Sequence, residues 1–169
     1  MLFRSHFTLL GLCVAAASAV AIGAGKMQLG LLLVICSALP DLLDGALAKA
    51  SNSASQRGAF FDSVVDRVSD SFLFGGVAWF YATSSTPLFA MVPFAALAAS
   101  LIISYERAKA ESLGLSAKGG LMERAERIIL LCVGLLFDSL LKWVMVIMLV
   151  LIVITAVQRF IKVWKQAAV

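Results

Sequence analysis

Four aspartates within one stretch of 26 residues have the spacing of a metal site. Asp41 and Asp44 are three residues apart, and Asp62 and Asp66 are four residues apart. On a helix, either spacing puts both carboxylates on one face. Carboxylate oxygens are the ligands that Mg²⁺, Mn²⁺ and Ca²⁺ prefer. The stretch therefore predicts two acidic pairs, on two helices joined by a short polar turn, that together hold divalent cations.

These aspartates belong to a chain that is far more apolar than a soluble protein. Hydrophobic residues make up 62% of the 169 residues, and the mean hydropathy is +0.98. Soluble domains are roughly 45–50% apolar, so we predict a polytopic membrane protein with one compact domain over residues 1–169. Ionisable groups are costly in a membrane, which favours a functional role for the acids. The simpler alternative is that they form ion pairs with Lys49, Arg57 and Arg67.

The elements that must position the aspartates are six hydrophobic segments. These segments and the polar turns between them predict an all-α bundle of six transmembrane helices. Some apolar runs are shorter than the roughly 20 residues that a span needs, and the second to fourth segments make up the difference by extending beyond the bilayer. The segments run from about Phe7 to Ile22, Leu29 to Lys49, Arg57 to Ala82, Leu88 to Tyr105 with a charged continuation, Ala125 to Phe137, and Leu140 to Phe160.

Basic residues give this bundle an orientation. In a six-helix arrangement, every Lys and Arg except Lys26 and Lys142 lies on the same side as the four aspartates. The positive-inside rule assigns that side, with both termini, to the cytoplasm. We therefore expect a multi-pass protein of the cell membrane, the inner membrane of a bacterium, with a cytoplasmic active face. The formal net charge of +4 then reflects topology and lipid contact, and we expect no nucleic-acid partner.

A second polar stretch, residues 104–127, carries basic side chains on the same predicted side. Arg124 and Arg127 lie about one helical turn apart and can face one pocket. Arg159 lies near the cytoplasmic end of the last segment. Guanidinium groups that face the aspartates suit an anionic substrate. The alternative is that these residues are interfacial anchors that meet lipid headgroups.

The spacing of the first stretch can be written D-x2-D-G-x2-A-K-x8-G-x3-D-x3-D. It closely resembles the signature of the CDP-alcohol phosphotransferase family, and it departs from that signature only at Lys49, where the family has arginine. Members of the family transfer a phospho-alcohol group from a CDP-linked donor to an acceptor hydroxyl and release CMP. The resemblance therefore implies a membrane-embedded transferase.

The resemblance also implies roles for individual residues. Asp41, Asp44 and Asp62 would ligate two divalent cations, Mg²⁺ or alternatively Mn²⁺, and Asp66 would touch one of them. Asp66 would also be the general base that takes the proton of the acceptor hydroxyl. Two cations can hold a diphosphate and neutralise the charge that develops in an in-line displacement. The positions that match donor-binding residues of the family are Gly45, Lys49, Ser55 and Gly58.

The second half of the chain narrows the resemblance to one branch of the family. Residues 103–127 combine an I-S-Y start, a Gly-Gly pair and an ER-x-ER run, and residues 157–164 read VQRFIKVW. Both stretches resemble phosphatidylinositol phosphate synthases, which use CDP-diacylglycerol as the donor and inositol phosphate as the acceptor. The resemblance also suggests a homodimer. By residue matching, the acceptor phosphate would be held by Ser104, Arg107, Arg127 and Arg159.

Other functions stay open at this point. Within the family, the product could be phosphatidylglycerophosphate, or the donor could be an archaeal-type ether lipid. Outside the family, intramembrane carboxylates also mark cation or proton transporters. A transport site would lie near the bilayer midplane, whereas these acids lie at one side. A non-catalytic lipid-binding scaffold would leave the complete acid set without a role.

Overall fold

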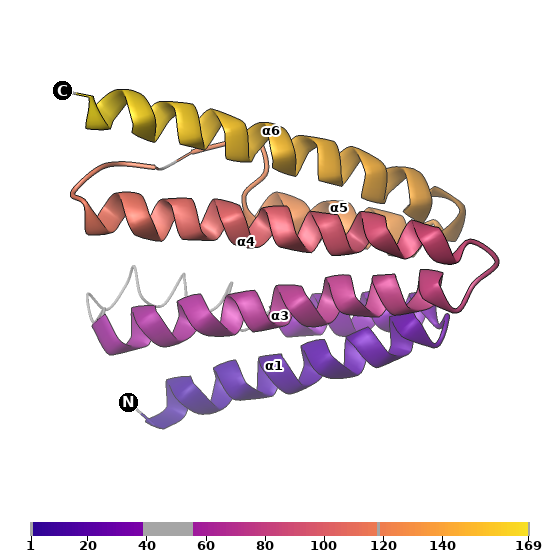
Figure 1. Ribbon diagram of the computed structural model, residues 1–169. Coiled ribbons are helices and arrows are strands. Elements are labelled where there is room, and N and C mark those ends of the chain that lie inside the picture. The colour runs from indigo at the N-terminus through magenta and orange to yellow at the C-terminus, as the bar shows by residue number, and fades with distance from the viewer. Residues whose placement is uncertain (1, 39–55, 118, 169) are drawn as a thin grey trace. The chain divides into compact units, whose positions relative to one another are not determined.

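The computed structural model describes residues 2–38, 56–117 and 119–168, and every regular element among them is helical (Figure 1). These residues form six helices and two short 3-10 turns, which confirms the predicted all-α class and helix count. The contacts of the chain divide it into two compact units, Met1–Pro87 and Leu88–Val169. The prediction of a single domain over residues 1–169 stays a prediction.

Three helices build the first unit. They are α1 (Leu2–Gly23), a helical segment at Met27–Ala38, and α3 (Gln56–Ala82). α1 ends in a turn where Gly25 adopts φ +76°. There the Gly25 N–H donates to the Ile22 carbonyl at 2.9 Å, and the Lys26 N–H donates to the Ala21 carbonyl at 2.9 Å. This is the Schellman pattern, whose left-handed residue favours glycine.

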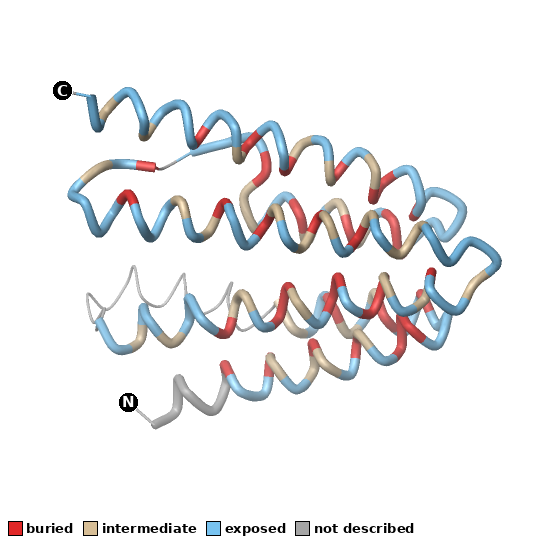
Figure 2. Tube along the Cα trace, in the orientation of Figure 1, coloured by how far each residue is buried: buried red, intermediate tan, exposed pale blue. Residues whose placement is uncertain are grey.

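Small residues let the helices of the first unit approach closely. A side chain at Gly76 of α3 would meet the backbone of Ala19 in α1 at 2.6 Å. The buried Ser18 hydroxyl donates to the Gly30 carbonyl at 3.0 Å and so links α1 to the next helical segment. Figure 2 shows buried positions recurring along both α1 and α3. This packing fixes α3, the helix that carries the described acids, against α1.

The second unit contains α4 (Met91–Ser112), α5 (Arg124–Leu136) and α6 (Leu141–Ala167). The turn η1 (Pro87–Ala90) precedes α4, and η2 (Asp138–Leu140) joins α5 to α6. α6 presents one buried stripe at helical spacing, which begins at Leu141 and is apolar as far as Ile152. The stripe then becomes polar at Thr155 and Arg159. These two residues face the other polar groups of the unit.

Two helical stretches are long and apolar enough to cross a membrane, judged by length and composition. They are Pro87–Ser112 and Asp138–Ala167. Thr8–Gly23 and Met27–Ala38 are also apolar but shorter. Many large apolar side chains are exposed, among them Leu88 and Trp143, and an outer surface of this kind suits contact with lipid.

The observed helices follow the predicted segments but are longer at several ends. α4 continues through the predicted charged stretch to Ser112, and α6 continues to Ala167, beyond the predicted end at Phe160. Hydropathy marks only the part of a helix that is apolar enough for a bilayer, whereas the backbone hydrogen bonds continue through the polar turns that follow. The last turns of α4 matter because they carry Arg107. The last turns of α6 directly follow Arg159.

Candidate active site

The first half of α3 carries three acidic residues at four-residue spacing. Asp62, Asp66 and Asp70 lie on one face of the helix. Exposure falls along this face, because Asp62 is exposed, the Asp66 side chain is 27% exposed and Asp70 is 4% exposed. Gly58 lies one turn before Asp62 and puts no side chain over that end of the face. The acidic face is therefore open to solvent at its start and closed two turns later.

Asp66 has a basic neighbour on its own helix. Arg67 Nη1 lies 3.4 Å from Asp66 Oδ2 and donates to the Ser63 carbonyl at 2.9 Å. The side chains of Arg67 and Asp66 are 36% and 27% exposed. Solvent therefore weakens this ion pair. A carboxylate has about four lone-pair sites. The Asp66 side chain is nevertheless 27% exposed, so a proton or a cation can reach it from solvent.

The described acids fit a divalent cation in their chemistry. Asp62 and Asp66 offer carboxylate oxygens from one helix face, and Mg²⁺ commonly binds through one or two carboxylates together with substrate phosphates and water. No group of three or more possible ligand side chains occurs within residues 2–38, 56–117 and 119–168. The remaining predicted ligands and donor-binding residues, which are Asp41, Asp44, Gly45, Lys49 and Ser55, lie outside the described residues.

Arg159 of α6 occupies the middle of a buried polar cluster in the second unit. The residue is only 4% exposed. Its Nη1 donates to the Ile103 carbonyl of α4 at 3.0 Å, and its Nη2 donates to the Gly119 carbonyl at 3.0 Å. Glu123 Oε1 lies 3.5 Å from the same Nη2. Arg159 therefore ties α4 and the segment before α5 to α6.

Arg127 lies in the first turn of α5 and is also 4% exposed. Its Nη1 donates a long hydrogen bond of 3.4 Å to the Met122 carbonyl. The Met122 N–H in turn donates to Thr155 Oγ1 of α6 at 3.1 Å. The charges of Arg127, Arg107 and Glu106 all act on the Arg159 guanidinium. The structure thus brings three of the predicted acceptor residues into one electrostatic neighbourhood.

The other predicted acceptor residues are less enclosed. Ser104 is half-buried, follows Ile103 directly and donates its hydroxyl to the Ser100 carbonyl at 3.1 Å. Arg107 is exposed, and its Nε lies 3.0 Å from Glu111 Oε1 one turn further along α4. Arg107 can therefore change partners without disturbing the core.

A comparison with protein families gives the class of this site. The sequence profile described as CDP-alcohol phosphatidyltransferase matches residues 3–164, nearly the whole chain. The chain belongs to this family. It is therefore an enzyme of the phosphatidyltransferase class, and the acids of α3 lie in the half of the chain that carries the family signature.

Curated relatives of this phosphatidyltransferase have closely related names. The archaetidylinositol phosphate synthase of Methanothermobacter thermautotrophicus is 36% identical over 166 residues, covering 95% of this chain and 83% of that protein. The phosphatidylinositol phosphate synthase of Mycobacteroides abscessus is 38% identical over 117 residues, covering 68% of this chain and 53% of that protein. Both names describe enzymes whose lipid product carries inositol phosphate.

Solved structures agree with these sequence comparisons. The phosphatidylinositol phosphate synthase of Mycobacterium tuberculosis with CDP-DAG bound is similar with a TM-score of 0.87 at 33% identity, covering 95% of this chain and 86% of that chain. The same enzyme in complex with manganese and citrate gives a TM-score of 0.88 and 33% identity. Use of a divalent metal is therefore supported for the phosphatidyltransferase described here.

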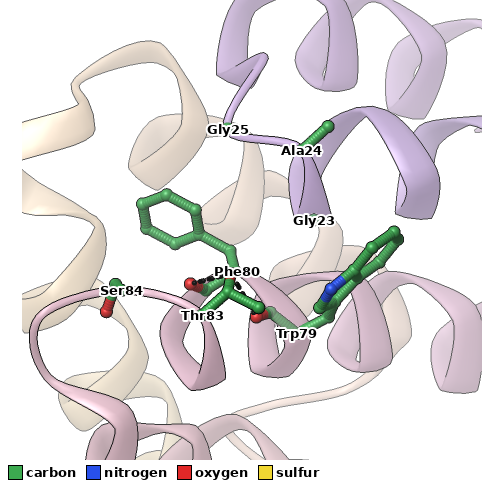
Figure 3. Close-up of a pocket in the computed structure, with 7 residues that line it drawn as sticks. All are labelled: Gly23, Ala24, Gly25, Trp79, Phe80, Thr83 and Ser84. Atoms are coloured by element: carbon green, nitrogen blue, oxygen red, sulfur yellow. Dashed lines mark hydrogen bonds between the residues drawn. The ribbon is translucent and has the colours of Figure 1, made fainter.

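A shallow pocket in the first unit lies away from the acids of this transferase. It has a volume of about 390 Å³ and is formed by the turn Gly23–Gly25, by Trp79 and Phe80 near the end of α3, and by Thr83 and Ser84 just after it (Figure 3). The Thr83 hydroxyl there is within hydrogen-bond distance of the Trp79 and Phe80 carbonyls, at 3.1 and 3.2 Å. Trp79 is roughly 20 Å along the helix from Asp66 at 1.5 Å per residue. The pocket therefore takes no part in the chemistry of the acids.

Sequence reasoning missed two buried polar residues of this transferase. Asp70 continues the four-residue spacing of Asp62 and Asp66, so the period of the acids was a signal that could have found it. Thr155 lies one turn before Arg159 in an otherwise apolar run. The signal that could have found Thr155 was its hydroxyl, which lies four residues before Arg159 and so on the same helix face.

Proposed function

We propose that this enzyme transfers the phosphatidyl group of CDP-diacylglycerol to inositol phosphate, releasing CMP and forming phosphatidylinositol phosphate. The observation that carries the proposal is the similarity over 95% of the chain to a phosphatidylinositol phosphate synthase whose structure holds CDP-DAG. The buried guanidinium groups of Arg127 and Arg159 support a phosphorylated acceptor, because a phosphate monoester gains from several charge-assisted hydrogen bonds. A neutral polyol would call for hydroxyl-directed groups instead.

The reaction is one displacement at phosphorus. The acceptor hydroxyl oxygen forms a bond to the phosphorus that carries diacylglycerol, and the bond from that phosphorus to the bridging oxygen of CMP breaks. CMP leaves with that electron pair. The hydroxyl proton goes to a carboxylate, and we assign this base to Asp66 because its side chain is partly exposed on the acidic face of α3. Asp62 lies one turn before it on the same helix face.

Aspartates of both acidic pairs would hold the metal of this reaction. We assign two divalent cations, Mg²⁺ or Mn²⁺, to Asp41, Asp44 and Asp62, with Asp66 touching one of them. The cations, when bound, supply positive charge that neutralises the diphosphate and the charge developing on it. The donor would be contacted by Gly45, Lys49, Ser55 and Gly58. Gly58 suits this role because it leaves the start of the acidic α3 face uncovered.

The acceptor phosphate would be bound by groups of the second unit. We assign it to Ser104, Arg107, Arg127 and Arg159. A guanidinium has five N–H donors, and Arg159 directs donors to Ile103, Gly119 and Glu123. The Arg159 Nε–H has no hydrogen-bond partner among the described residues. Arg159 therefore carries one buried N–H donor that its contacts to the described residues leave unused.

The membrane arrangement belongs to the same proposal. We infer six membrane-spanning helices in the cell membrane, both termini and the aspartates on the cytoplasmic side, and a homodimer. The two long apolar stretches and the exposed apolar side chains support the spans. Labelling single cysteines at positions 26 and 162 from one side of sealed vesicles tests the topology. Positions labelled from opposite sides are expected, and labelling from the same side contradicts the six-span arrangement.

A CMP-release assay tests the function itself. Purified protein would be supplied with CDP-diacylglycerol, Mg²⁺ and, in parallel, inositol phosphate, free inositol or glycerol 3-phosphate. Release with inositol phosphate well above the other two is expected. Equal reaction of free inositol would remove the case for a phosphate pocket. Preference for glycerol 3-phosphate would keep the pocket and change the product to phosphatidylglycerophosphate.

A second donor is favoured by one specific observation. The archaetidylinositol phosphate synthase at 36% identity suggests that an ether-lipid CDP donor is an alternative for this chain. The same assay, with inositol phosphate fixed and the two donor lipids compared, separates the possibilities. Faster CMP release from the ether-lipid donor would assign this chain to the archaetidyl reaction.

A further inference from the structure

We propose that Thr155 is a positioning residue for the acceptor-phosphate site, acting on Arg127 through the peptide groups of Met122. The inference rests on the proposed function, since it takes Arg127 to be a ligand of the acceptor phosphate. Thr155 touches no predicted substrate group itself. Its role is to fix where α5 begins and where the Arg127 guanidinium lies.

The hydrogen bonds form a continuous chain from α6 to Arg127. The Thr155 hydroxyl donates to the Leu151 carbonyl at 2.8 Å, which directs its oxygen lone pairs away from that carbonyl. Thr155 Oγ1 accepts the Met122 N–H at 3.1 Å. The carbonyl of Met122 then accepts from Arg127 Nη1 at 3.4 Å. One side chain on α6 thus sets the position of the backbone to which the guanidinium is bound.

The three residues that form this series of hydrogen bonds are all buried. Thr155 is fully buried, and Met122 and Arg127 are 3% and 4% exposed. Water cannot easily replace the Thr155 hydroxyl there, so the Met122 N–H would lose its partner if the hydroxyl were removed. Met122 directly precedes Glu123, the N-cap of α5. The anchor therefore acts at the point where the chain turns into the helix that carries Arg127.

The glycine before this anchor has the conformation that close approach requires. Gly120 has φ +148°, and a Cβ there would meet the Thr155 Cγ2 methyl at 2.5 Å and lie 3.7 Å from Arg159 Nη2. Only a residue without a side chain lets the backbone run this close to Thr155. Both the Thr155 hydroxyl and its methyl are thus fitted to the segment before α5.

The segment is held at a second point along the same face of α6. Gln166 Nε2 donates to the Ser116 carbonyl at 2.8 Å, and Gln166 Oε1 accepts the Ser116 N–H at 3.1 Å. Gln166 lies eleven residues after Thr155, about three helical turns, so the two side chains point in nearly the same direction. Thr155 is the buried anchor nearest to Arg127, and Gln166 is the half-buried one at the far end.

The test compares Thr155→Val with Thr155→Ser in the full-length protein. Valine keeps the shape and removes the hydroxyl, whereas serine keeps the hydroxyl and loses the methyl. Thr83→Val is the matched control, because Thr83 also bonds its i−4 carbonyl, at 3.1 Å, but directly follows α3 in the first unit. The KM for inositol phosphate, the KM for CDP-diacylglycerol, kcat and the hydrogen exchange of the Met122 amide would be measured for each.

Thr155→Val is expected to raise the KM for inositol phosphate about fivefold or more, with kcat and the donor KM within about twofold of wild type. The Met122 amide should exchange faster in this variant. Thr155→Ser and Thr83→Val should resemble the wild type in all four measurements. This pattern would support a positioning role, since a general loss of structure would move both KM values and kcat together.

Two results would overturn the inference in different ways. If Met122 exchanges faster in Thr155→Val but the acceptor KM is unchanged, the hydrogen-bond chain exists and does not position the acceptor site. If both KM values and kcat change together, Thr155 has only a structural role. Wild-type protein that releases no CMP with any phosphorylated acceptor would instead defeat the proposed function, and this inference with it.

Discussion

Asp62 on α3 is exposed and Asp66 is about a quarter exposed, whereas Arg127 and Arg159 of the second unit are each 4% exposed. The Arg159 guanidinium donates to two backbone carbonyls and meets Glu123 within the second unit. One region thus presents charge at the surface, and the other builds charge into the packing of helices.

The difference follows from what each kind of group must do. Carboxylates that exchange cations and protons need access to solvent, because each turnover changes what they bind. Guanidinium groups that select a phosphate gain from fixed geometry, since bidentate contacts depend on the direction of each N–H. We therefore expect substitutions of the acids to change turnover, and substitutions of the buried arginines to change acceptor affinity together with stability.

The largest effect is expected at the acids. Asp66→Asn should lower kcat roughly 10²–10⁴-fold, the usual contribution of a general base, with little change in the KM for CDP-diacylglycerol. Asp62→Asn should also abolish most turnover, because it removes a predicted metal ligand. Steady-state CMP release at saturating Mg²⁺ measures both. Asp138→Asn is the matched control, since Asp138 is exposed and lies in η2, and its activity should equal that of the wild type.

Two outcomes at the acids would change the assignment. Near-wild-type activity of Asp62→Asn would remove the two-metal proposal. Equal loss of donor affinity and of rate in Asp66→Asn would make Asp66 a plain metal ligand. Chelation of divalent cations gives an independent check, because it should stop CMP release, and added Mg²⁺ or Mn²⁺ should restore it.

The buried arginines should show the next largest effect. Loss of a charge-assisted hydrogen bond is worth on the order of 1.5–3 kcal/mol, so Arg127→Ala or Arg159→Ala should raise the acceptor KM about tenfold or more. The donor KM should change little. Arg159→Ala should also lower the melting temperature more than Arg127→Ala, because it leaves the Ile103 and Gly119 carbonyls without their donor.

A neighbouring cation provides the control for this prediction. Lys162 is exposed and lies one turn after Arg159 on α6, so Lys162→Ala removes a positive charge near the buried cluster but keeps both buried guanidinium groups. It should leave the acceptor KM within twofold of wild type. A comparable rise in KM would mean that the cluster acts through its overall charge and that fixed geometry contributes little.

The acids of α3 could be predicted from the sequence, whereas the buried contacts of the second unit could not. Helix positions and the acids could be found because they depend on local spacing and hydropathy, and Asp62 and Asp66 do lie one turn apart on α3. The burial of Arg159 could not be found, since it depends on carbonyls at Ile103 and Gly119 that are distant in sequence. Thr155 was missed for the same reason, because its partner Met122 is 33 residues away.

A smaller effect is expected at the paired glycines before α5. Gly119 and Gly120 have φ +90° and +148°, so alanine at either position adopts an unfavourable backbone and should cost about 1–2 kcal/mol. Only Gly120→Ala also forces a Cβ against Thr155. Gly120→Ala should therefore lower the melting temperature further than Gly119→Ala and raise the acceptor KM as well. Equal effects of the two variants would show that close approach to Thr155 is unimportant.

The smallest effect is expected at the exposed ion pair of α4. Arg107 and Glu111 lie 3.0 Å apart with side chains 45% and 51% exposed, and such a pair contributes about 0.3–0.5 kcal/mol. Glu111→Gln should shift the melting temperature barely at all, and it should keep or slightly lower the acceptor KM because it frees Arg107 for phosphate. Raising the salt concentration should erase even this difference, since exposed charges are screened over about 8–10 Å. A large rise in acceptor KM would instead mean that Glu111 holds Arg107 in its binding position, and the contrast between surface and buried guanidinium groups would no longer hold.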